Sequence, residues 1–158
     1  IVTVYARLRR LNPVIRGEDS GQLVFGFANG ATAILDANRY NENEAQEPRL
    51  TFGELRLDAS QGHVLLDTDG ALYRKPLGAA THRHAYAWEN RGFAGDSVYR
   101  LQRHFVAQLR SGGAFESEGA DYLNTVKVVE ACYASAARGQ VIDLTAWQPD
   151  AAAPHGAT

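Results

Sequence analysis

Two histidines separated by a single residue, His82 and His84, are the first side chains in the sequence whose spacing suggests chemistry. Alternate residues of a strand point to the same face, so the two imidazoles would lie side by side at a spacing that a metal ion accepts. No third ligand follows at a recognisable distance. We therefore predict surface or interface histidines here, with a metal site as the weaker alternative.

Two polar stretches are better candidates for ligand contact. Residues 38–42, Asn-Arg-Tyr-Asn-Glu, follow a predicted strand, and residues 92–96, Gly-Phe-Ala-Gly-Asp, precede a predicted helix. Strand ends and helix N-termini are where proteins commonly place the groups that contact a ligand. The residues that we predict to bind substrate are Arg39, Tyr40, Asn41 and Asp96.

Structural roles compete with ligand binding in both stretches. Asp96 would then act only as the N-cap of its helix, its carboxylate accepting free backbone N–H groups of the first turn. Arg39 would only pair with Glu42 or Glu44. The sequence leaves both alternatives open.

Motifs for nucleotide binding and for nucleophilic catalysis are missing from the sequence. It contains no GxGxxG or GxxxxGK[ST] phosphate loop and no GxSxG elbow. No catalytic, cofactor-binding or metal-binding residue is therefore assigned. The carboxylates of Asp58, Asp67 and Asp69 are predicted to serve turns, and Glu18 and Asp19 to be solvated.

Most of the first two thirds of the sequence reads as strands. Apolar and polar residues alternate over residues 1–9, and apolar runs flank Asn29-Gly30 and Asp69-Gly70. Both pairs predict hairpins with type I′ turns, in which both central residues have a positive φ. Pro76 is predicted to end a strand or to place it at an edge. The predicted strands cover residues 1–9, 22–28, 31–37, 49–58, 63–66, 71–75, 82–88 and 141–144.

A helical period begins after Gly95. A first helix is predicted to end at Ser111-Gly112-Gly113, and a second to run from about Gly119 to Arg138 and end at Gly139. The apolar stripe predicted for the second helix consists of Leu123, Val126, Val129, Cys132, Tyr133 and Ala136.

This order of elements predicts an α+β fold, namely an open, mostly antiparallel β-sheet of about seven or eight strands with two helices late in the chain packed on one face. Two helices cover one face of such a sheet only. The other face favours pairing with a second subunit, so we predict a homo-oligomer.

Length and composition agree with one globular domain. The chain has 158 residues, 45% hydrophobic and 22% charged, with a net charge of −2, which favours neither nucleic acid nor a membrane as partner. The single cysteine, Cys132, fits a reducing compartment and a cytoplasmic location. The start at Ile1 without a methionine suggests a piece of a longer chain. We predict a domain over residues 1–147 and a disordered tail over 148–158.

Four segments resemble the C-terminal domain of Gfo/Idh/MocA-family NAD(P)-dependent oxidoreductases. They are residues 34–42 (ILDANRYNE), 49–58 (RLTFGELRLD), 92–112 (GFAGDSVYRLQRHFVAQLRSG) and 115–144 (FESEGADYLNTVKVVEACYASAARGQVIDL). The last is the most specific, and the order and spacing of all four carry the resemblance, which covers residues 1–144.

The resemblance implies a large open sheet whose exposed face builds a dimer or tetramer. It also implies a preceding Rossmann domain with GxGxxG, a Glu-Lys-Pro motif and an Asp-x-x-x-His element that supplies the acid/base histidine. This sequence contains none of these motifs, so the catalytic residues of the family match no position here. By analogy, Tyr40 matches an aromatic residue that reaches the substrate, and Asp96 starts a helix near the cleft.

We therefore expect the substrate-binding and oligomerisation domain of an NAD(P)-dependent oxidoreductase that acts on a sugar, cyclitol or related polyol. NAD or NADP is implied for the full-length protein and not for this fragment, which alone is expected to be inactive. The alternative is a non-catalytic carbohydrate-binding or subunit-assembly module.

Overall fold

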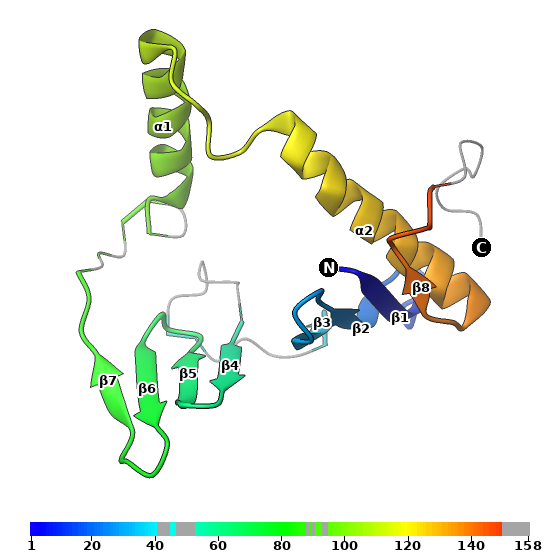
Figure 1. Cartoon of the computed structure of the whole chain (residues 1–158), viewed down its shortest axis with the longest axis horizontal. Helices are drawn as coiled ribbons and strands as arrows, with labels where there is room; N and C mark the ends of the chain where they lie inside the picture. Colours follow the sequence, from blue (N-terminus) through cyan, green and yellow to red (C-terminus); the bar gives the residue numbers. More distant parts are fainter. Residues whose placement is uncertain (41–44, 47–52, 88, 90, 93–94, 150–158) are drawn as a thin grey trace. The chain divides into compact units, whose positions relative to one another are not determined.

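The computed structural model describes residues 1–40, 45–46, 53–87, 89, 91–92 and 95–149, in two compact units (Figure 1). The first unit combines residues 1–41 with 116–158, and the second comprises residues 42–115. Several predictions fall outside the described residues: the site residue Asn41, the start of the strand at 49–52, and most of the tail, 150–158.

The first unit contains a four-stranded sheet in which every pair of neighbours is antiparallel. The last strand of the chain joins the edge of the first, where Val4 pairs with Ile142. In spatial order the strands are β3 (Thr32–Asn38), β2 (Ser20–Gly26), β1 (Thr3–Arg9) and β8 (Ile142–Asp143).

The two predicted hairpins are confirmed, but their turn type is not. The Phe27 N–H donates to the Ala31 carbonyl and the Gly30 N–H to the Phe27 carbonyl, both at 2.9 Å. Only Gly30, with φ 85°, takes the left-handed conformation in this turn. The turn at residues 67–71 repeats the pattern at 3.0 Å, with φ 80° at Gly70. Each loop is thus a three-residue turn with a glycine bulge, and the type I′ prediction is wrong because a single residue has the positive φ.

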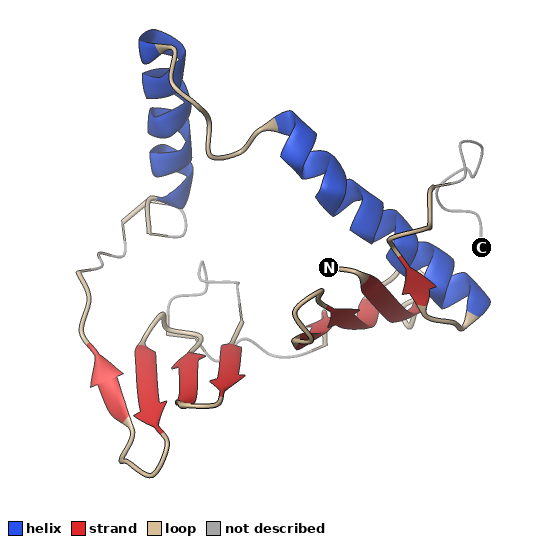
Figure 2. Ribbon diagram, viewed as in Figure 1, coloured by secondary structure: helices blue, strands red, loops and turns tan. Residues whose placement is uncertain are grey.

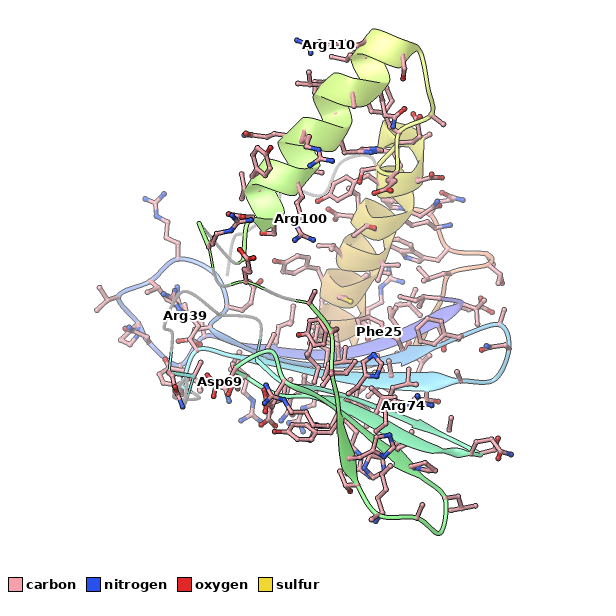
Figure 3. The ribbon with its side chains drawn as sticks, turned by 90° about the vertical axis from the view of Figure 1, so that its left-hand side faces the viewer. Phe25, Arg39, Asp69, Arg74, Arg100 and Arg110 are labelled. Carbon is pink, nitrogen blue, oxygen red and sulfur yellow. The ribbon has the colours of Figure 1, made fainter. Side chains whose placement is uncertain are left out.

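Helix α2 (Gly119–Arg138) packs across β1 and β8 and closes the core of the first unit. Its bounds are those predicted, and Gly139 ends it with φ 63°. The side chain of Phe25, labelled in Figure 3, is partly buried against this core. The buried core residues are Val4, Ala6, Ala131, Cys132, Ile142 and Leu144.

The predicted apolar stripe of α2 is only partly the buried face. Cys132 is buried, whereas the side chains of Leu123 and Val129 are 66% and 46% exposed. The helix runs past the end of its sheet, so the N-terminal half of α2 has no strand of this unit beneath it (Figure 1). The helix face that meets the sheet carries small residues, Ala131 and Ser135 among them, which allow close approach.

The second unit contains the other four strands and the first helix. Pro76 ends β6, as predicted, while the strand predicted over residues 82–88 is shorter. In spatial order the antiparallel strands are β4 (Leu55–Ala59), β5 (Gly62–Leu66), β6 (Leu72–Pro76) and β7 (His82–His84). Helix α1 (Ser97–Ser111) ends at Gly112, and none of its residues is buried.

The α+β class is confirmed: the described residues form eight strands, paired antiparallel, and two helices late in the chain (Figure 2). The strands form two sheets of four in place of one continuous sheet. Within the described part of the chain, neither helix has the length and apolarity that crossing a bilayer requires.

Candidate functional site

The best-defined polar site of the first unit lies where β3 ends. Tyr40 follows the strand and is held by its backbone, because its N–H donates to the side-chain oxygen of Asn38 at 2.9 Å. Its side chain is 54% exposed. At its inner end the Tyr40 hydroxyl donates a hydrogen bond to a carboxylate oxygen of Asp19. An exposed aromatic ring with an anchored hydroxyl is thus presented to solvent.

Asp19 is the anchor of this site. Its carboxylate accepts the N–H of Leu11 at 2.7 Å and the N–H of Asn12 at 2.8 Å, one on each oxygen. Its own N–H donates to the Arg9 carbonyl at 3.0 Å, and its carbonyl accepts the Arg39 N–H at 3.1 Å. Asp19 therefore joins the end of β1, the start of β2 and the end of β3.

The prediction that Asp19 is solvated is wrong. The residue is only 3% exposed, because the chain between β1 and β2 folds over it and donates two amides to it. The prediction holds for Glu18, which is exposed and accepts a hydrogen bond from the Tyr133 hydroxyl at 2.5 Å. The sequence alone did not predict that Asp19 is buried, because the amides that bind its carboxylate are backbone groups that nearly every residue carries.

The electrostatics of the pair keep Asp19 charged and Tyr40 neutral. Burial raises the pKa of the Asp19 carboxyl, but hydrogen bonds from the Tyr40 hydroxyl and from the Leu11 and Asn12 amides outweigh it, so the pKa lies below its usual value. The hydrogen bond to Asp19, with desolvation and the nearby negative charge, raises the pKa of Tyr40. At neutral pH the carboxylate only accepts and the phenol holds its proton.

Arg39 and Asn41 flank Tyr40 in the sequence. Arg39, labelled in Figure 3, is exposed, and its backbone is fixed by the hydrogen bond to Asp19. The predicted alternative for Arg39, a pair with Glu42 or Glu44, falls outside the described residues, as does Asn41 itself. The structure therefore brings Arg39 and Tyr40 together with Asp19.

Asp96 belongs to the second unit, at the start of α1. It occupies the N-cap position, but its carboxylate makes no capping hydrogen bond, so the predicted capping role is wrong. N-cap residues usually have an extended backbone, whereas Asp96 has φ 66° and ψ 18°. Its carboxylate pairs with the Arg91 guanidinium at 3.3 Å, and its carbonyl accepts the Arg100 N–H at 2.9 Å.

Two carboxylates and two histidines of the second unit were also singled out in the sequence. Asp67 accepts the N–H groups of Asp69 and Ala71 at 3.1 and 2.8 Å, which confirms its turn role. Asp58 pairs along the strand with Arg56 at 2.9 Å, so the turn role predicted for it is wrong. His82 and His84 are exposed on β7, and nowhere in the described ranges do three His, Cys, Asp or Glu side chains gather as metal ligands.

Comparisons of the sequence with known proteins identify two related dehydrogenases. No protein-family model matches the chain. It is 34% identical over 154 residues to a D-apiose dehydrogenase from Rhizobium rhizogenes and 31% identical over 164 residues to one from Paraburkholderia graminis. These matches cover 92% and 97% of this chain but 44% and 42% of the relatives, so the chain spans less than half of their length.

A solved oxidoreductase structure is similar to this chain in both sequence and fold. An oxidoreductase from Agrobacterium radiobacter, crystallised with NAD+, L-tartaric acid and magnesium, is 30% identical and superposes with a TM-score of 0.76. The match covers 92% of this chain and 44% of that one. The homologues of this chain are thus D-apiose dehydrogenase and oxidoreductases of the Gfo/Idh/MocA type, matched over about 44% of their length, which agrees with the C-terminal domain that the sequence motifs predicted.

Proposed function

We propose that this chain is the substrate-binding and subunit-assembly domain of an NAD(P)-dependent oxidoreductase that acts on a sugar. The observation that carries the proposal is the 34% identity to a D-apiose dehydrogenase along 92% of this chain. D-apiose is therefore the first substrate to test. The 30% identical solved oxidoreductase, which contains NAD+, supports the same reaction class.

The cofactor would be held by the part of the parent protein outside this chain. The sequence here carries no GxGxxG loop for a dinucleotide. When bound, the nicotinamide supplies or accepts the hydride, while residues of this chain hold and orient the sugar. We propose no catalytic residue in this chain. A cytoplasmic location is part of the proposal, since the thiol of Cys132 is free.

Tyr40 is the central residue of the proposed sugar site of the first unit, with Arg39 and Asn41 as further contacts. Asp96, in the second unit, is proposed as a substrate contact on its own. The ring of Tyr40 is exposed while its hydroxyl is anchored, so the ring is presented in a fixed orientation. A ring held in this way offers a flat apolar surface for the C–H face of a sugar and a polar atom for its hydroxyls. Little side-chain entropy is then lost on binding.

The test uses the full-length protein with NAD+ or NADP+ and a panel of D-apiose, other aldoses, cyclitols and sugar nucleotides. We expect reduced nicotinamide to form with at least one sugar. Tyr40→Phe and Asp96→Asn should lower kcat/KM, while Tyr122→Phe, at an exposed tyrosine of α2, should not. If sugars bind without turnover under any condition, the non-catalytic binding module replaces the enzyme.

The assembly role rests on the face of the first sheet opposite α2. Val4 and Ala6 of β1 are buried on the side of the helix, so Tyr5 points the other way. The register places Tyr5 beside Val24 and Val24 beside Ile34, and the last two are 37% and 78% exposed. We propose that this row contacts a second copy in a dimer or tetramer.

The solution mass of the full-length protein tests the assembly role. Ile34→Lys should lower the mass measured by light scattering, because a lysine charge in an apolar contact is costly to desolvate. Ala137→Lys, at an exposed position of α2, is the control and should leave the mass unchanged. An unchanged oligomer in the Ile34→Lys variant would remove this face from the interface.

A further inference from the structure

We propose that Asp19 sets the direction of the hydrogen bond that Tyr40 makes with the sugar, so that the Tyr40 hydroxyl accepts a hydrogen bond from a substrate hydroxyl. The inference rests on the proposed function, which places Tyr40 in the sugar site. Asp19 acts through Tyr40 and is a positioning residue. The substrate class that follows is a sugar with a free hydroxyl donor at the contacted carbon.

The position of the phenolic proton follows from the partners of Asp19. A tyrosine hydroxyl has one proton to donate and lone pairs that accept. Both carboxylate oxygens of Asp19 are acceptors, already facing the N–H groups of Leu11 and Asn12. The Tyr40 proton therefore points at Asp19. The side of the Tyr40 hydroxyl oxygen that faces solvent carries only lone pairs. The lowered pKa of Asp19 keeps its carboxylate ionised at neutral pH, in agreement with this arrangement.

Asp19 cannot itself turn to the ligand. The residue is 3% exposed, and its carboxylate has hydrogen-bond partners from the β1–β2 loop at 2.7 and 2.8 Å. Its backbone is also tied to Arg9 and Arg39. Releasing the carboxylate would leave two amide donors without an acceptor. The exposed group of the pair is Tyr40, at 54%, so the ligand meets the tyrosine.

The direction of this hydrogen bond makes the site selective among modified sugars. A hydroxyl of the substrate can donate to the Tyr40 oxygen. A fluorine at the same carbon cannot donate, although it resembles a hydroxyl in size and accepts weakly. A deoxy carbon does neither. If Tyr40 accepts, the fluorinated sugar should therefore be as poor a substrate as the deoxy sugar; if Tyr40 donates, fluorine should be tolerated better than hydrogen.

The experiment measures kcat/KM of the full-length protein for D-apiose and for its deoxy and deoxyfluoro analogues, each changed at one hydroxyl. We expect one position at which both analogues lose about tenfold, the worth of one hydrogen bond. The Tyr40→Phe variant should have a lower kcat/KM for D-apiose. It should also no longer distinguish D-apiose from the analogues that are changed at that sugar position. Tyr122→Phe is the matched control and should keep the full difference.

Asp19→Asn tests the positioning role. The side-chain amide can donate to the Tyr40 oxygen, which frees the phenolic proton to point outward. We expect this variant to accept the fluorinated sugar better, relative to D-apiose, than the wild type does. A merely structural role would change thermal unfolding and leave this ratio alone. An unchanged ratio in folded Asp19→Asn and Asp19→Ala variants would overturn the positioning role, because alanine leaves the Tyr40 hydroxyl no acceptor at this position.

The wild-type protein and Tyr40→Phe together decide the direction of the hydrogen bond without any change at Asp19. Fluorinated sugars tolerated at every position, or analogue losses that are the same in Tyr40→Phe, would overturn the acceptor role of Tyr40. If Asp19→Asn does not fold, these two comparisons still decide the direction of the bond. Failure of the proposed function is a different result, because the wild type would then reduce neither NAD+ nor NADP+ with D-apiose or any other sugar of the panel.

Discussion

The hydroxyl of Ser135 in α2 accepts the backbone N–H of Ala6 in β1 at 2.9 Å, across 129 residues of sequence. The same hydroxyl donates to the Gln140 carbonyl at 2.6 Å. Strand β8 is short and pairs only with Thr3 and Val4, so the amide of Ala6 lies beyond its reach. The helix side chain thus supplies the acceptor that the sheet does not.

Ser135→Ala is expected to destabilise the first unit by roughly 1–3 kcal/mol, because it leaves the N–H of Ala6 buried without an acceptor. Ser135 is fully buried, so water cannot replace its hydroxyl without a rearrangement. Denaturant unfolding measures the change. The control is Thr125→Ala at an exposed position of the same helix, which should stay within about 0.5 kcal/mol of the wild type. Equal stability of the two variants would contradict the role of Ser135.

Tyr133 should titrate unusually high for a tyrosine. Its hydrogen bond to Glu18, with desolvation and neighbouring negative charge, raises its pKa to about 12. Because the folded pKa lies above the unfolded one, the stabilisation is fully present below about pH 10 and is lost as the pH rises toward 12. Ultraviolet titration of Glu18→Gln should show the pKa of Tyr133 returning toward its usual value. Glu54→Gln, at an exposed residue, should leave the titration unchanged.

Gly62 should be intolerant of any side chain. It has φ 133°, and a Cβ built there would lie 2.1 Å from the Lys75 carbonyl oxygen and 2.8 Å from the Pro76 Cα. Both are backbone atoms of the neighbouring strand, so Gly62→Ala must shift β5 from β6, at a cost of about 2 kcal/mol or more.

Gly78→Ala is the control for Gly62→Ala. Gly78 also has a positive φ, 74°, but nothing lies within 4 Å of the position its Cβ would take. Gly78→Ala should lower the free energy of unfolding by only about 1 kcal/mol, which is the strain of the backbone conformation. Hydrogen exchange of the β5 and β6 amides reports the difference between the variants. Equal protection in both would show that the close contact at Gly62 relaxes without cost.

Cys132 should react slowly with thiol reagents until the protein unfolds. Its side chain is 5% exposed, and burial raises the pKa of the thiol, so little thiolate forms near neutral pH. An Ala137→Cys variant adds a cysteine at an exposed position of the same helix and should react promptly. Rapid modification of one thiol in the wild-type protein would show that this part of α2 opens readily.

Local signals in the sequence predicted several elements well. Helix α2 begins at Gly119 and ends before Gly139 because its residues favour a helix and glycine readily takes the left-handed conformation at a C-terminus. Both hairpins follow from glycine at the turn. The turn type was not predictable from the residue pair, because the register of the flanking strands determines whether one or two residues take a positive φ.

The sequence by itself thus determined the helix bounds and the hairpins, which depend on neighbours a few residues apart. It also determined the α+β class and the family resemblance, which depend on the order of segments along the chain. The tertiary structure decided which face of α2 is buried. The small residues Ala131 and Ser135 are buried, whereas the larger Leu123 is exposed. It also decided that Asp19 is buried and bound to Tyr40. These outcomes depend on backbone groups that folding brings together from distant segments. Because every residue carries the same backbone groups, no pattern of residue types predicts these contacts.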